Sequence, residues 1–292
     1  MGSTQKIGSE DFVVLAEIDP PKGVDVSKML EQAGRIKGMV DAIVVPELST
    51  AVMRMSSLGA CMILEREGLE VIMQVSCRDR NRLALQADLL SAYACGIQNL
   101  MLVIGETPRI GDHIETKPVF DVDIYELLQT IGTLERGRDM AGIELTGRPT
   151  YFVGTQINTG LDDQSVDAEI ERAIQMNADG AAYFVTTPVF DLEALKRFSD
   201  RIAHLKVPII PTVLLLKSAG MARYMDRNLA HIHVPEDLIQ RLHKAPDKAL
   251  ESVQIAAELI HAIQARGFRG ALISTMGWED KLPDIINAKE AL

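Results

Sequence analysis

Eight short apolar runs recur along the chain, and this recurrence constrains the fold more than any other feature. Each run is continuous and rich in β-branched residues, rather than alternating between polar and apolar positions. Continuous runs of this kind are typical of parallel strands that are covered on both faces. The eight runs comprise residues 12–19, 41–47, 70–77, 99–106, 151–157, 181–188, 207–216 and 270–276.

Stretches with helical periodicity separate these runs. Repeated strand-then-helix units imply right-handed crossovers and a parallel sheet. Eight units favour a (β/α)₈ TIM barrel that forms a single domain over residues 1–292, with residues 1–10 as a flexible N-terminus. A doubly wound open sheet is the alternative, but no glycine-rich phosphate loop follows the first run. Helices are predicted at residues 26–36, 51–67, 81–94, 123–136, 163–176, 191–204, 235–243 and 247–266.

Composition excludes several classes of partner. The net charge is −11 and the pI is near 5.1, so neither nucleic acid nor an anionic membrane is expected to bind. No apolar run reaches the roughly 18 residues of a membrane span, and the N-terminal sequence lacks the pattern of a secretory signal. Cys61, Cys77 and Cys95 lack metal-ligand spacing and fit a reducing compartment. The sequence therefore predicts a cytoplasmic protein without a metal site.

Polar residues at the ends of the predicted strands are the candidates for a functional site, because barrel enzymes place their sites at the C-terminal ends of the strands. This rim is rich in carboxylates and amides and contains no histidine, so neither a transition-metal site nor acyl-transfer chemistry is favoured. The candidates are Glu17, Asp19, Glu47, Gln74, Ser76, Arg78, Asp79, Glu106, Gln156, Asn158, Thr186, Thr187, Lys217 and Thr275.

Six strings near these strand ends resemble the methylenetetrahydrofolate reductase family, and they occur in the family's order over most of the chain. They are AEIDPPKG (16–23), AVMRMSS (51–57), SCRDRNRLALQADLLSAYACGIQNLMLVIGE (76–106), GDHIETKPVFDVD (111–123), TTPVFDLEALKRF (186–198) and VPIIPTVLLLKS (207–218). The resemblance implies a (β/α)₈ barrel that reduces 5,10-methylenetetrahydrofolate to 5-methyltetrahydrofolate in one-carbon metabolism, which feeds methionine biosynthesis. It also implies FAD as the cofactor and NAD(P)H as the co-substrate.

The resemblance assigns roles to individual residues. Glu17 matches the acid that protonates N10 of the folate, and Glu106, in the pair Gly105–Glu106, matches a second acid beside the flavin and the pterin. Both are therefore predicted to be catalytic. The implied FAD contacts are Gln74, Ser76, Arg78, Gly105, Gln156 and Asn158, and the implied substrate contacts are Glu17, Thr187 and Phe190.

The residues themselves leave some of these roles open. Glu17 lies between an apolar stretch and the Pro20–Pro21 turn, where burial would raise its pKa as a proton donor requires; a salt bridge at the rim is the alternative. Arg78 suits a phosphate or a glutamyl carboxylate, and pairing with Asp79 is the alternative.

Several positions depart from the family's pattern. This chain has Glu106 where Asp is usual, Thr187 where a Gln binds the pterin, Pro46 for a Thr near the flavin, and Met176 for a Lys at the FAD phosphates. Two other functions therefore remain open. One is a flavin-independent member acting on a C1-carrying pterin, and the other is a catalytically silent paralogue that binds a pterin or serves as a partner subunit. A homo-oligomer is also possible, and the choice between NADH and NADPH is open.

Overall fold

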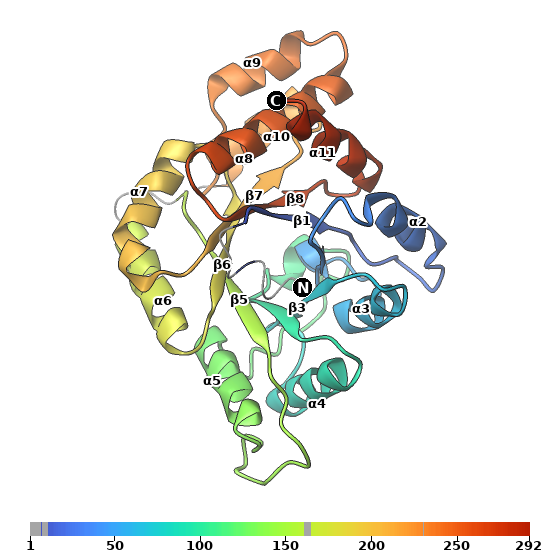
Figure 1. Cartoon of the computed structure of the whole chain (residues 1–292), viewed down its shortest axis with the longest axis vertical. Helices are drawn as coiled ribbons and strands as arrows, with labels where there is room; N and C mark the ends of the chain where they lie inside the picture. Colours follow the sequence, from blue (N-terminus) through green and yellow to red (C-terminus); the bar gives the residue numbers. More distant parts are fainter. Residues whose placement is uncertain (1–6, 8–10, 161–164, 230) are drawn as a thin grey trace.

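Eight parallel strands close into a barrel in the computed structural model, which describes residues 7, 11–160, 165–229 and 231–292 (Figure 1). Each strand lies within one of the apolar runs, so the predicted (β/α)₈ TIM barrel is confirmed. Neighbouring strands pair in sequence order, and β8 closes the barrel onto β1. The strands are β1 (Val13–Glu17), β2 (Ala42–Val45), β3 (Val71–Ser76), β4 (Asn99–Val103), β5 (Phe152–Ile157), β6 (Tyr183–Pro188), β7 (Ile209–Leu214) and β8 (Gly270–Ser274).

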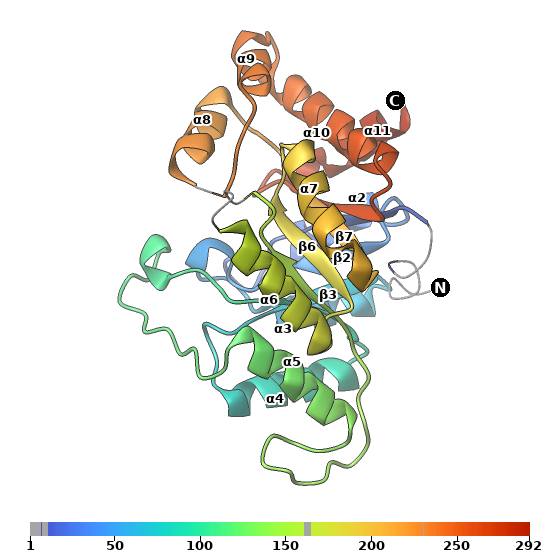
Figure 2. The same ribbon diagram turned by 90° about the vertical axis from the view of Figure 1, so that its left-hand side faces the viewer.

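Helices surround the strands in Figure 1, and the long segment between β4 and α5 projects on the same side as α8 in Figure 2. Two helices of the structure, α8 and α11, had not been predicted. The predicted flexible N-terminus falls on residues 1–10, of which all but Ile7 lie outside the described residues. The described helices are α2 (Ser27–Ile36), η1 (Ser49–Ala51), α3 (Ser57–Arg66), α4 (Arg82–Ala94), η2 (Pro108–Ile110), α5 (Ile124–Glu135), α6 (Val166–Ala178), α7 (Leu192–Ile202), η3 (Ala203–Leu205), α8 (Ala219–Asn228), α9 (Glu236–Lys244), α10 (Lys248–Ala265), η4 (Glu279–Lys281) and α11 (Leu282–Glu290).

Apolar side chains fill the lower half of the barrel interior, which is the half nearer the N-terminal ends of the strands. The Tyr183 ring stacks on Phe152 with the ring centroids 5.1 Å apart, and its hydroxyl donates to the Leu100 carbonyl at 2.9 Å. Gly154 makes room for this ring, because a Cβ at that position would overlap it. The buried cluster comprises Ile7, Val13, Leu15, Ala42, Val44, Ile72, Met101, Val103, Tyr183, Val185, Ile210 and Leu272.

A second and larger apolar cluster lies between the strands and the surrounding helices. Helix starts are fixed by polar side chains at their N-caps. Asp123 and Glu126 form a capping box at the start of α5, and Asn81 and Asp191 cap α4 and α7. Both layers of the barrel wall are therefore packed, and the loops that follow the strands are held at one end of it.

Candidate active site

A layer of polar side chains occupies the interior at the C-terminal ends of the strands. Alternate residues of a strand face the same side, so a strand whose apolar residues fill the lower interior can contribute its next inward residue to this layer. On β1, for example, the inward residues Val13 and Leu15 are followed by Glu17. By the same alternation the layer comprises Glu17, Gln74, Ser76, Gln156, Thr212 and Ser274. Thr187 follows a register shift in β6, and its hydroxyl meets Asn158 at the same end of the barrel.

Glu17 is the residue of this layer whose pKa is shifted from its ordinary value. Its Oε1 accepts a hydrogen bond from the Ser274 hydroxyl at 2.7 Å. Burial raises the pKa of Glu17 to about 7, the Ser274 hydrogen bond opposes that rise, and the negative charges of Asp19 and Glu279 add to it. The alternative for Glu17, a salt bridge at the rim, is not supported, because the charged groups that act on this carboxyl, Asp19 and Glu279, are both acidic.

Gln74 is fixed by its neighbour strand. Its Oε1 accepts from the Glu47 main-chain N–H at 2.9 Å, which leaves the amide Nε2 as the donor end. The Glu47 carboxylate itself is used structurally: it accepts from the Ser57 N–H at 2.7 Å at the start of α3, and from Arg80 at 3.0 Å. Gln74 can therefore act in the interior, whereas Glu47 holds the loop behind it.

Arg78 is buried and already paired. Its guanidinium donates to both carboxylate oxygens of Asp79, at 2.7 and 2.8 Å, and to the main-chain carbonyls of Leu48 and Glu106 at 3.2 Å. Only 3% of the residue is exposed. A guanidinium in this arrangement joins three loops, and its charge is balanced before any ligand arrives.

Gly105 and Glu106 follow β4 at the rim. Gly105 has a φ of 91°, and a Cβ there would lie 2.5 Å from the Ser76 hydroxyl oxygen and 2.7 Å from the Arg78 Cβ. Ser76 in turn accepts from the Arg78 N–H at 3.1 Å. Only glycine allows this close approach of the two loops. Glu106 is exposed, and its role as a second acid beside the flavin and the pterin stays a prediction.

Asn158 and Thr187 are brought together from β5 and β6. The Thr187 hydroxyl donates to the Asn158 Oδ1 at 3.2 Å, and the Gly160 N–H donates to the same oxygen at 3.1 Å. Since both bonds occupy Oδ1, the Asn158 amide presents its N–H groups as the free end. The main chain of Gln156 is held nearby by Arg172, whose Nη2 donates to its carbonyl at 2.8 Å.

Phe190 and Met176 lie away from this layer. Both are buried in the apolar cluster between the strands and the helices. The Met176 sulfur accepts from Arg172 at 3.4 Å, and that arginine is paired with Glu169 at 2.7 Å. The position that resembles a phosphate-binding lysine is therefore part of the core packing, and Phe190, predicted to contact substrate, packs there too.

The rim also holds groups that sequence reasoning did not connect with Glu17. Lys217 follows β7; its Nζ donates to the Met276 carbonyl at 2.6 Å and lies 5.1 Å from the centre of the Trp278 ring. Burial lowers the pKa of Lys217, while Glu279 and Asp19 oppose that change. Ser274 was missed entirely, although its signal is simple: it is the next inward residue after Leu272 on β8.

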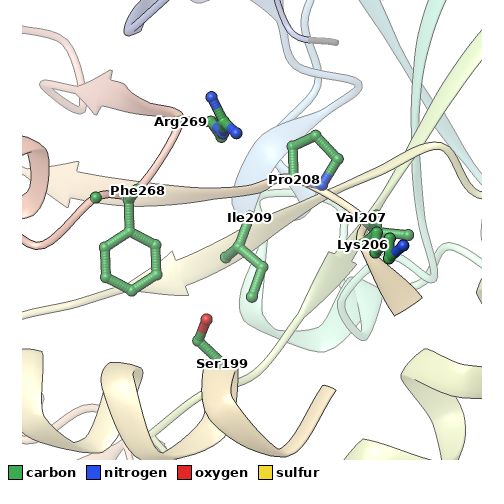
Figure 3. A pocket seen from close by; sticks show the side chains of 8 residues that line it. Ser199, Lys206, Val207, Pro208, Ile209, Phe268 and Arg269 are labelled. Atoms are coloured by element: carbon green, nitrogen blue, oxygen red, sulfur yellow. The ribbon is translucent and has the colours of Figure 1, made fainter. Parts of the chain in front are cut away.

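Two cavities adjoin the barrel. One of about 590 Å³ lies between the loops after β1 and β8, and Asp19, Arg54 and Glu279 are among its lining residues. The other, of about 440 Å³, lies at the opposite end of the barrel, where Ser199, Lys206 to Ile209, Phe268 and Arg269 surround it (Figure 3). The first cavity lies at the same end of the barrel as the polar layer.

Within the described residues, no group of three or more His, Cys, Asp or Glu side chains is arranged to hold a metal ion. In the same part of the chain, no helix is long and apolar enough to cross a membrane.

Comparison with known proteins identifies the family. The family model described as methylenetetrahydrofolate reductase matches residues 3–290. The chain belongs to this family. Methylenetetrahydrofolate reductase 2 of Schizosaccharomyces pombe is 24% identical over 204 residues, which are 67% of this chain and 31% of the relative. The chain thus matches about a third of the length of this curated relative.

Solved structures of other enzymes share the fold. Oxaloacetate acetylhydrolase in complex with 3,3-difluorooxalacetate has a TM-score of 0.55 and 12% identity, covering 99% of this chain and 84% of that one. 2,3-Dimethylmalate lyase has a TM-score of 0.54 and 10% identity, with the same coverage. At this identity the likeness shows the barrel alone.

The donor set at the mouth fits the ring of a flavin. Gln74 and Asn158 each have their amide oxygen occupied and their N–H groups free, which suits the carbonyl and ring-nitrogen edges of a flat heterocycle. The diphosphate is a different matter, because Arg78 is paired with Asp79 and Met176 is buried. Any cations that hold a diphosphate here would have to be other residues of the chain.

Proposed function

We propose that this protein reduces the methylene group of 5,10-methylenetetrahydrofolate, or of another C1-carrying reduced pterin, to a methyl group, with NAD(P)H as the source of hydride. The family match supports the reaction class. The observation that carries the proposal is Glu17: an acid at the barrel mouth with a pKa of about 7 is suited to give up a proton at neutral pH.

Glu17 supplies the proton in this reaction. Its carboxylic acid protonates N10 of the pterin, the bond between N10 and the methylene carbon breaks, and the electron pair of that bond stays on N10. The methylene carbon, now doubly bonded to N5, accepts hydride and becomes the N5-methyl group. One proton and one hydride are consumed, and solvent reprotonates the Glu17 carboxylate.

The other residues of the layer bind and orient. Gln156 and Asn158 donate from β5 to a flavin ring, and Thr187, whose hydroxyl binds Asn158, contacts the pterin. Gln74 donates to a flavin ring, with Ser76 and Gly105 shaping the loop behind it. Glu106, at the rim, is the second acid beside the flavin and the pterin in this proposal. Bound FAD would supply a two-electron carrier between NAD(P)H and the pterin.

A flavin-independent reaction is the second candidate, and a specific observation favours it. The groups predicted to meet FAD near its phosphates and at β2 offer no free donor: Arg78 is paired, Met176 is buried, and Pro46 has no N–H. In this case hydride passes directly from NAD(P)H to the methylene carbon, and the role of Glu17 is unchanged.

The test is anaerobic turnover of the purified protein. The protein is mixed with 5,10-methylenetetrahydrofolate and NADH or NADPH, with and without FAD, and the methyl product is measured by mass spectrometry. The visible spectrum of the protein shows whether flavin is bound. Product that requires flavin supports the first candidate, and product without flavin supports the second. No product from any combination, while the pterin still stabilises the protein against heat, would indicate the silent paralogue.

Location and assembly belong to the same proposal. We expect the protein in the cytoplasm, as a homo-oligomer or with a partner subunit of one-carbon metabolism. The acidic charge of −11 supports a small-molecule substrate rather than nucleic acid. Light scattering of the purified protein tests the oligomeric state.

A further inference from the structure

Closure of the barrel places Ser274 beside Glu17. In the pairing of β1 with β8, Ala16 is opposite Ile273, so residues 17 and 274 follow side by side and both face the interior. Ser274 is 6% exposed, and its carbonyl accepts from the Leu215 N–H at 2.9 Å. The strand backbone therefore fixes the serine before its hydroxyl binds Glu17.

The hydrogen bond distinguishes the two oxygens of the Glu17 carboxyl. Oε1 accepts from the Ser274 hydroxyl at 2.7 Å, so Oε2 is the oxygen left to carry a proton. A proton donor must present one oxygen to its substrate in a defined direction. Ser274 meets that requirement because it binds only the other oxygen.

Two more carboxylates border the same end of the barrel. Asp19 accepts from the Ser49 hydroxyl at 3.0 Å and faces Arg54 at 3.4 Å. Glu279 is 7% exposed; it accepts from the Gly277 N–H at 3.0 Å and from Gln32 at 3.3 Å. These donors hold both carboxylates in place at the end of the barrel.

Lys217 is the basic group at the end of β7 that faces these acids. Its ammonium is bound to the Met276 carbonyl and interacts with Asp19, Glu279 and Asp280. By contrast, the charged groups that act on the pKa of Glu17 are Asp19 and Glu279. Lys217 therefore interacts with the surrounding carboxylates rather than with Glu17.

We propose that Ser274 is a positioning residue for Glu17, and that Asp19 and Glu279 are fixed negative charges that keep the proton on Glu17 until the substrate takes it. The serine and the two acids then act in opposite directions on the same proton. The serine stabilises the carboxylate and directs the acid, whereas the two charges disfavour the carboxylate. The catalytic meaning of this arrangement rests on the proposed function, but the arrangement itself does not.

The test measures the titration of Glu17 in the protein without ligand. Glutamate side-chain carboxyls are labelled with ¹³C, and the Glu17 signal is assigned by its loss in Glu17→Gln. We expect Ser274→Ala to raise the pKa of Glu17 by about 1, and Glu279→Gln to lower it by about 1. Asp19→Asn gives a second variant with the same sign as Glu279→Gln, and Ser274→Thr, which keeps the hydroxyl, restores the parent titration.

Glu31→Gln is the matched control, since it removes an exposed charge of α2 and should leave the titration unchanged. Circular dichroism checks that each variant is folded. The proposal is overturned when Ser274→Ala and Glu279→Gln shift the Glu17 titration in the same direction, or when neither variant shifts it beyond the control.

The titration needs no substrate, so its result is separate from that of the turnover assay. Opposite shifts without pterin reduction would leave this inference standing and remove the proposed function. Where both hold, the alkaline limb of the pH profile for pterin reduction moves with the titration of Glu17 in each variant.

Discussion

The two halves of the barrel interior are built from the same strands but differ in side-chain chemistry: the lower half is apolar and the upper half is polar. On β1 the inward residue changes from Leu15 to Glu17 within two positions, and on β8 it changes from Leu272 to Ser274. The lower half is filled by apolar side chains that pack against one another. The upper half places polar groups where burial is costly and satisfies them one bond at a time. Buried polar groups are costly to stability, so a layer of them at the strand ends is the place to look for function.

The largest effect is expected from overfilling the lower half. In Gly154→Ala the new methyl group overlaps the Tyr183 ring, and both are buried, so the free energy of unfolding should fall by about 3 kcal/mol or more. Urea unfolding measures the change. Gly34→Ala in α2 is the control: its Cβ meets nothing within 4 Å, and it should stabilise the helix by about 0.5–1 kcal/mol. A Gly154→Ala protein as stable as the parent would contradict the described packing.

In the upper half, Glu17 should make the free energy of unfolding depend on pH. Burial raises the pKa of Glu17 from its ordinary value of 4.5 to about 7 in the folded protein. Its contribution to stability is therefore fully present below pH 4.5 and is lost as the pH rises through 7. Glu17→Gln keeps the Ser274 hydrogen bond and removes the titration. We expect it to be more stable than the parent by about 3 kcal/mol near pH 8, relative to their difference near pH 4.

Thermal and urea unfolding across this pH range measure that difference. Glu31→Gln, at an exposed position, should show no comparable dependence. An equal effect of Glu17→Gln at all pH values would mean that the carboxyl is not titrating in this window.

Tyr183→Phe separates stability from function. The variant keeps the ring that fills the lower half and leaves the Leu100 carbonyl without its hydroxyl donor. We expect a loss of about 1–2 kcal/mol in the free energy of unfolding. Turnover of the folded variant should match that of the parent, and a large loss of turnover would show that the lower half takes part in the reaction.

The smallest effect is expected at the Asn158–Thr187 pair. Thr187→Val removes the 3.2 Å hydrogen bond and should change the free energy of unfolding by less than about 1 kcal/mol. The KM for the pterin should rise, because Thr187 is the proposed pterin contact. Thr186→Val is the comparison: Thr186 is buried and donates within β6, so its loss should reduce stability without changing KM.

The strands were predictable because each apolar run is covered on both faces, and the structure places all eight within the predicted runs. The predicted start of the 51–67 helix was wrong, because α3 begins at Ser57. Leu48, Thr50 and Ala51 adopt positive φ there without any glycine to mark the turn. Local sequence carries no signal for a conformation that tertiary contacts impose.

The site was predictable in place but only partly in chemistry. Strand ends identify the rim, so Glu17, Gln74 and Asn158 were found. Ser274 was not, because it meets Glu17 only through closure of β8 onto β1, 257 positions apart in the chain. The pairing of Arg78 with Asp79 was one of two alternatives that only geometry could separate.

The most direct test of the central claim, that Glu17 is the proton donor, is the pre-steady-state comparison of Glu17→Gln with the parent. Stopped-flow mixing follows pterin reduction separately from the oxidation of NAD(P)H by an added flavin or other acceptor. The account predicts that pterin reduction falls by about 10²–10⁴ while the oxidation of NAD(P)H is nearly unchanged, because only the first step needs a proton at N10. An equal loss in both steps, or no loss in either, would contradict it.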